Sequence, residues 1–222
     1  KNRTSFQIAE TIENVGGYIN AYTSRELTNY YCRVLSEDVP LAMDVISDIV
    51  LNSILEKTEV DIERGVILQE IGQSNDTPDD IIFDWLQETA YPDQPYGRSI
   101  LGPAKNIKTI SRENLLSFTQ SHYSPNKMIL CAAGDVNHDK LAVLSKKYFS
   151  HLSKKLEVEL IPGQFVGGER RVIKDLEQAH FALSFKSSSI KDRDIYVSQI
   201  FAVAMGGGMS SKLFQEIRER RG

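Results

Sequence analysis

The sequence predicts an α+β fold, with a mixed or antiparallel sheet and helices packed on one face. Three observations lead to this prediction. Apolar residues recur at helical spacing in several segments, residues 18–24 and 27–35 have the composition of a β-hairpin, and the apolar run at 127–134 is typical of a buried strand. Strands accompanied by several helices in this way form two packed layers.

The helices are expected where apolar spacing and capping residues agree. Thr4 or Ser5 can cap the first helix, and Ser111 followed by Asn114 makes a partial capping box. Residues 39–52 have the clearest amphipathic pattern, with apolar side chains at i, i+3, i+4, i+7 and i+8. The predicted helices are residues 4–15, 39–52, 56–75, 78–89, 111–122, 137–150, 192–205 and 210–220.

Two units are predicted along the chain. Residues 1–155 form the first, and the polar, Gly- and Pro-containing stretch 156–168 is a linker. Residues 169–222 begin a strand–strand–helix pattern, with strands at 170–175 and 179–186, and are too few for a whole domain. We therefore expect a chain cut from a longer protein at both ends.

Composition excludes several functional classes. The 222 residues, 41% of them hydrophobic, are enough to bury a core. A net charge of −4, from 26 basic and 30 acidic residues, argues against nucleic acid as a partner. No membrane span is expected, because no apolar run approaches the length required. The two cysteines, Cys32 and Cys131, are expected to pack unpaired inside strands.

The helix predicted at 56–75 carries the most informative pair of residues. Thr58 is its candidate N-cap, and Gly72 is the first of the residues that are expected to end the helix. Glu63 and Glu70 are seven residues apart, which returns them to within about 20° of the same direction. Their stripe also carries Val66, Ile67 and Ile71, so we expect both carboxylates to point toward the protein interior at its edge.

Carboxylates in such a position need a partner. It could be an Arg or Lys side chain, backbone amides, or a metal ion. Spacing alone favours structural ion pairing, because buried carboxylates are more often paired than metal-bound.

No catalytic motif is complete. The four histidines have no spacing typical of a zinc site, and we expect ordinary surface or core roles for them; they are His122, His138, His151 and His180. Neither a GxSxG elbow nor a phosphate loop is present. The glycines Gly206, Gly207 and Gly208 predict a mobile loop, either a simple helix connection or a flap that contacts an extended peptide.

Four stretches taken in order resemble the zinc peptidases of the mitochondrial processing peptidase and pitrilysin family, whose metal motif is HxxEH. The likeness is greatest to the β-type processing peptidase and its bacterial relatives, and it runs the whole length of the chain. It implies a processing-peptidase-like domain followed by the beginning of a second, homologous one. The stretches are IENVGGYINAYTSRE at 12–26, DIERGVILQE at 61–70, YGRSILGP at 96–103 and GGGMSSKLFQEIRERRG at 206–222.

The resemblance assigns roles to individual residues. It implies that Glu70 is a zinc ligand. It also implies that Glu63 is a supporting carboxylate, which orients the site without binding the metal itself. Asn20 and Ala21 match the edge strand that pairs with substrate. Arg218 matches an arginine that stabilises the tetrahedral intermediate.

The HxxEH motif itself does not occur in the chain. The resemblance places it before Lys1, where it would supply two histidine ligands and the general base. Glu70 alone is one ligand, so we expect this chain not to hold zinc tightly, although the parent protein would bind Zn²⁺.

The predicted function is therefore that of a zinc endopeptidase acting on extended peptides or presequences. The main alternative is a non-catalytic homologue, such as an α-type subunit or a respiratory-complex core protein, that binds peptide or scaffolds a dimer. Glu63 and Glu70 on one helix face favour the peptidase. A homo- or heterodimer is expected, in the bacterial cytoplasm or the mitochondrial matrix.

Overall fold

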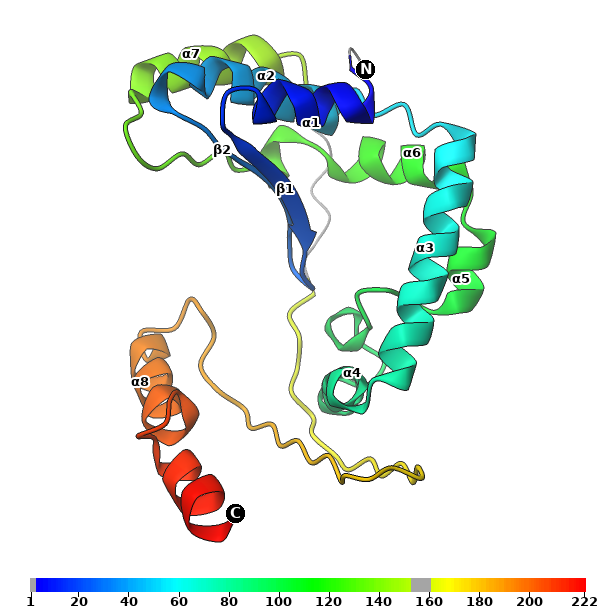
Figure 1. The fold of residues 1–222 in the computed structure, drawn as a ribbon, viewed down its shortest axis with the longest axis vertical. Coiled ribbons are helices and arrows are strands. Elements are labelled where there is room, and N and C mark those ends of the chain that lie inside the picture. The colour runs from blue at the N-terminus through cyan, green and yellow to red at the C-terminus, as the bar shows by residue number, and fades with distance from the viewer. Residues whose placement is uncertain (1–2, 153–160) are drawn as a thin grey trace.

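The computed structural model describes residues 3–152 and 161–222, and its fold is α+β, as predicted (Figure 1). The fold consists of helices α1 to α8 and a two-stranded antiparallel sheet, and a π-helical segment follows α8. The bounds are α1 Ser5–Glu13, β1 Tyr18–Thr23, β2 Thr28–Arg33, α2 Val39–Leu51, α3 Lys57–Asp76, α4 Pro78–Ala90, α5 Ala104–Thr109, α6 Arg112–His122, α7 His138–Phe149, α8 Ile195–Gly206 and the π-helix Phe214–Glu219.

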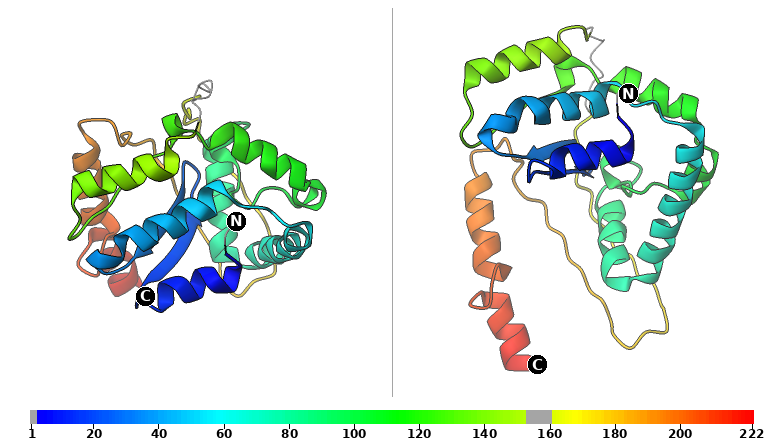
Figure 2. Two further views of the ribbon diagram at one scale, coloured as in Figure 1. Left: turned by 90° about the horizontal axis from the view of Figure 1, so that it is seen from above. Right: turned by 45° about the horizontal axis from the view of Figure 1, so that its top comes forward.

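The β1–β2 hairpin lies under a layer of helices. Its register pairs Tyr18 with Arg33 and Thr23 with Thr28. Helix α1 contacts β1, α2 contacts β2, and α7 packs on α2 (Figure 2). Ile12 of α1 and Val45 of α2 are fully buried in this layer. The helices therefore pack on one face of the sheet, as expected.

The capping signals at Thr4 and Ser111 were predicted correctly. The Thr4 side chain and Gln7 form a capping box at α1. Ser111 and Asn114 do the same at α6, so asparagine replaces the usual glutamate without losing the reciprocal hydrogen bonds. These signals depend on neighbouring residues alone, which is why sequence identifies them.

Three predicted strands are absent. Within the described residues only β1 and β2 form a ladder, and residues 127–134, 170–175 and 179–186 are not strands. Ile129 is 89% exposed and Phe181 is 83% exposed. An apolar run specifies a buried strand only when a neighbouring strand pairs with it, and none does here.

Other departures are smaller. Cys32 and Cys131 are unpaired as predicted, but Cys131 is exposed because its segment is not a buried strand. Helix α5 was not predicted. Part of the predicted linker 156–168 lies outside the described residues, and the rest runs extended beside α4, so the domain boundaries stay a prediction. No helix in the described residues is both long and apolar enough to cross a membrane.

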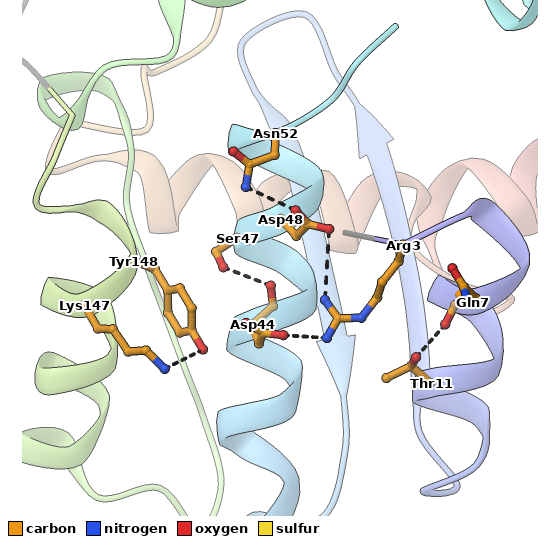
Figure 3. Close-up of polar contacts among 9 residues, drawn as sticks. All are labelled: Arg3, Gln7, Thr11, Asp44, Ser47, Asp48, Asn52, Lys147 and Tyr148. Atoms are coloured by element: carbon orange, nitrogen blue, oxygen red, sulfur yellow. Dashed lines mark hydrogen bonds and ion pairs between the residues drawn. The ribbon is translucent and has the colours of Figure 1, made fainter. Parts of the chain in front are cut away.

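Arg3 ties the start of the chain to α2 (Figure 3). Its Nη2 lies 2.5 Å from Asp44 Oδ2, and its Nη1 lies 4.0 Å from Asp48 Oδ2. Burial alone would raise the pKa of Asp44, but the hydrogen bonds from Arg3 and Tyr148 and the Arg3 charge outweigh it and lower that pKa. The ion pair therefore favours the folded state when Asp44 is ionised.

Asp44→Asn is expected to lower the free energy of unfolding at pH 7 by about 0.5–1 kcal/mol, a small value because the side chain is partly exposed. The folded pKa lies below the unfolded one, so this stabilisation is complete above the unfolded pKa and disappears as pH falls through the folded pKa. Urea denaturation at pH 7 and near pH 3 measures it, with the exposed Glu10→Gln as control. An equal loss at both pH values would contradict the electrostatic explanation.

Candidate functional site

A strained residue held by an arginine lies just before helix α3. Leu55 adopts a positive φ of 47°, which is unfavourable for a leucine. Arg112 donates to the carbonyls of Ile54 and Leu55 at 2.7 Å each. Thr58 is not the N-cap, because this turn starts the helix at Lys57 and Glu56 occupies the cap position without a side-chain bond.

Two further cations hold α3 along its length. Arg64 Nη1 donates to the carbonyls of Ile107 and Ile110, both at 2.8 Å. These carbonyls lie at the C-terminal end of α5, where backbone acceptors lack partners within the helix. Lys174 Nζ donates to the Asn75 carbonyl at 2.9 Å. The helix continues through Gly72, which does not end it, and buries no residue. Hydrogen bonds from charged groups therefore orient α3 where apolar burial does not.

Glu63 and Glu70 lie exposed on α3, so the prediction of inward, ion-paired carboxylates is wrong for this chain. In the described part of the chain neither carboxylate has a hydrogen bond or an ion pair. The stripe they share is open because no element covers it: Val66 is 41% exposed, and Ile67 and Ile71 are half-buried. Both carboxylates are therefore free to accept a ligand from outside the chain.

These residues do not make a zinc site by themselves. No group of three or more His, Cys, Asp or Glu side chains gathers anywhere in the described residues. Zinc needs at least three protein ligands, and Glu70 supplies one. The described residues alone therefore do not fit the metal.

In the described residues both outer edges of the two-stranded sheet are unpaired, and one of them is the outer edge of β1. The Ala21 N–H does not bond to β2; it donates to the Asn20 side-chain oxygen at 2.8 Å. In an antiparallel ladder alternate residues point their backbone groups away from the partner strand, so Ala21 presents its N–H to the open edge. Asn20 and Ala21 thus lie where an added strand would pair.

Three tyrosines on one face of the hairpin were not predicted as a cluster. Tyr31 lies opposite Asn20 and within 6.1 Å of Tyr18 and 6.2 Å of Tyr22, measured between ring centroids. The signal was present, since Tyr18, Asn20 and Tyr22 alternate along one strand face. On the other face, burial raises the pKa of Tyr30, whose hydroxyl lies 3.0 Å from that of Tyr123.

The hairpin tip is fixed to α4. Arg25 Nη2 lies 2.6 Å from Asp84 Oδ1, and both side chains are about three-quarters buried. A cavity of about 590 Å³ adjoins this contact, with Ile71, Asp84 and Trp85 in its wall. Neither the ion pair nor the cavity was predicted, because residues 25 and 84 are distant in sequence.

Arg218 and the three glycines lie apart from Glu70. Gly206 ends α8, and Gly207 and Gly208 form the turn after it. Arg218 stands in the π-helix with its guanidinium 5.0 Å from the Phe214 ring. Figures 1 and 2 show these C-terminal helices on the opposite side of the molecule from α3. The structure therefore does not bring Arg218 to Glu70.

Solved structures show where this fold recurs. A protease from Helicobacter pylori has a TM-score of 0.81 at 22% identity, covering 100% of this chain and 55% of that one. A peptidase M16 inactive domain from Pseudomonas fluorescens has a TM-score of 0.80 at 17% identity, with the same coverage. At these identities the likeness establishes the fold alone.

Curated relatives are similar over nearly the whole chain. An uncharacterized zinc protease of Rickettsia felis is 42% identical over 221 residues, which cover 99% of this chain and 54% of that protein. An Arabidopsis thaliana protein described as "Probable mitochondrial-processing peptidase subunit beta" is 40% identical over 210 residues, which cover 92% of this chain and 40% of that protein. The chain spans about half the length of these relatives or less.

Two family models divide the sequence between them. Residues 1–104 match the model described as Insulinase (Peptidase family M16). Residues 109–222 match the one described as Peptidase M16 inactive domain. The chain therefore belongs to peptidase family M16.

Proposed function

We propose that this chain is the substrate- and metal-binding part of a zinc-dependent endopeptidase that cleaves extended peptides or presequences. One observation supports it most strongly. Glu63 and Glu70 are exposed and without partners in the described residues, on one face of a helix that three cations hold in place. In an M16 chain such a face is suited to receive a metal ion rather than to build a core.

Glu70 would be one zinc ligand, and Glu63 would orient the site without binding the metal itself. The remaining ligands would come from polypeptide outside this chain, in keeping with relatives about twice its length that are named zinc proteases. Arg218 would stabilise developing negative charge at the scissile carbonyl. That role requires the C-terminal unit to approach α3.

Peptide binding would use the open edge of β1. An extended peptide can pair with an unpaired edge through backbone groups, and such pairing would give a preference for unfolded substrates. Gly206, Gly207 and Gly208 would form a flap that contacts such a peptide. The whole protein is proposed to act as a homo- or heterodimer in the bacterial cytoplasm or the mitochondrial matrix.

Glu70→Gln in the full-length peptidase is expected to abolish bound zinc and peptide cleavage, because the amide does not replace a carboxylate ligand. Glu63→Gln should reduce activity or zinc affinity by about 10–100-fold. Elemental analysis and a peptide cleavage assay measure both effects, and circular dichroism checks the fold.

Glu59→Gln, in the first turn of the same helix, is the matched control and should leave zinc and cleavage unchanged. Full activity of Glu70→Gln would refute the ligand assignment. Absence of zinc from the unaltered full-length protein would favour the non-catalytic homologue instead.

Ala21→Pro is expected to weaken binding of an extended peptide about fivefold, because it removes one edge N–H worth about 1 kcal/mol. The β1–β2 ladder should survive, since this N–H does not bond to β2. Fluorescence anisotropy with a labelled peptide, on the inactive Glu70→Gln background, gives the affinity. Ala21→Val, which keeps the N–H, is the control; equal affinity in all three proteins would refute strand addition.

A further inference from the structure

Residues 163–174, which we call the strap, run beside α4 although they follow it by more than seventy positions (Figure 1). At the α4 C-terminus, Gln94 donates to the Gln164 carbonyl at 2.8 Å and accepts from the Gln164 N–H at 2.7 Å. The Val166 N–H donates to the Ala90 carbonyl at 2.9 Å. Phe165 adds an edge-to-face contact with Tyr91. The first half of the strap is therefore docked through its backbone.

The second half docks through two cations on one tryptophan. The Arg170 guanidinium lies 4.8 Å from the centre of the Trp85 ring, and Lys174 Nζ lies 5.8 Å from it. Arg170 also pairs with Glu88 at 2.6 Å. A cation over an aromatic face gains about 0.5–2 kcal/mol, more when it is shielded from water.

Lys174 also reaches the helix that carries Glu70. Its hydrogen bond to the Asn75 carbonyl satisfies an orphan acceptor at the end of α3, where the helix dipole favours a positive charge. The strap thereby holds α4 and the end of α3 together.

Beyond Lys174, no hydrogen bond or ion pair among the described residues joins the chain to the N-terminal unit. The hydrogen bonds and ion pairs that the described residues 175–222 make, such as Ser198 with Ser188 and Arg220 with Glu216, stay within that segment. Figure 1 shows the chain turning back from the strap toward α8. Phe181 and Phe185 are each at least 80% exposed on the way.

We infer that the strap is a latch, which holds the link to the C-terminal helices against α4 and the end of α3. Trp85 is the residue on which it docks. The C-terminal helices then pivot after Lys174. Movement about residues 175–188 then leaves the Glu70 helix undisturbed. The inference concerns the geometry of the chain and does not depend on the proposed peptidase activity.

Arg170 and Arg171 provide a matched pair for the test. Arg170 contacts Trp85 and Glu88 of α4, whereas the neighbouring Arg171 pairs only with Glu169 of the strap itself in the described residues. The exchange rates of the Val166 and Gly167 amides, which donate to the Ala90 carbonyl, measure whether the first half of the strap stays docked. A loss of contact confined to Trp85 would not change these rates.

The double variant Arg170→Ala, Lys174→Ala should speed exchange at Val166 and Gly167 about tenfold, while Arg171→Ala leaves it unchanged. Trypsin should cleave the unaltered protein after Lys186 before it cleaves after Arg170, Arg171 or Lys174. Unchanged exchange in the double variant, equal acceleration by Arg171→Ala, or earlier cleavage within the strap would each overturn the latch.

Discussion

Helix α3 is held in place by cations that donate to backbone carbonyls, and the rest of the arrangement depends on this. It buries no residue, so apolar contact does not fix its direction. Arg112 fixes the turn before it, Arg64 joins its middle to α5, and Lys174 closes its end. Hydrogen bonds of charged donors are stronger than neutral ones, so they can orient a helix that has an exposed face and no buried residue.

Helix α4 is where separate parts of the chain meet. The hairpin tip reaches it through Arg25 and Asp84, and the strap lies against Trp85 and Glu88. The open edge of β1 and the carboxylates of α3 are therefore set relative to one another through a shared neighbour. A change in α4 would therefore affect both, although no strand pairing or ion pair in the described residues joins β1 directly to the carboxylates of α3.

Sequence predicted the features that depend on near neighbours. The hairpin, the N-cap at Thr4, the capping box at Ser111 and the length of α4 follow from residues a few positions apart. It failed where the outcome depends on distant partners. The inward direction of Glu63 and Glu70 assumed that something covers their stripe, and the run at 127–134 needed a strand beside it. Arg64 and Arg112 gave no sign of their carbonyl partners, because each lies more than forty residues from them.

The hydrogen bond between Asn20 and the Ala21 N–H has a consequence for the solubility of the protein. An open strand edge invites copies of the same chain to pair side by side and aggregate. By occupying the exposed donor, the asparagine removes one attachment point from such accidental ladders. In the proposed peptide-binding role, a peptide with several further contacts would displace this side chain, which also donates to the Tyr18 hydroxyl at 2.5 Å, whereas a neighbour with one contact would gain little. The same residue would thus both limit self-association and leave this edge accessible to the proposed peptide.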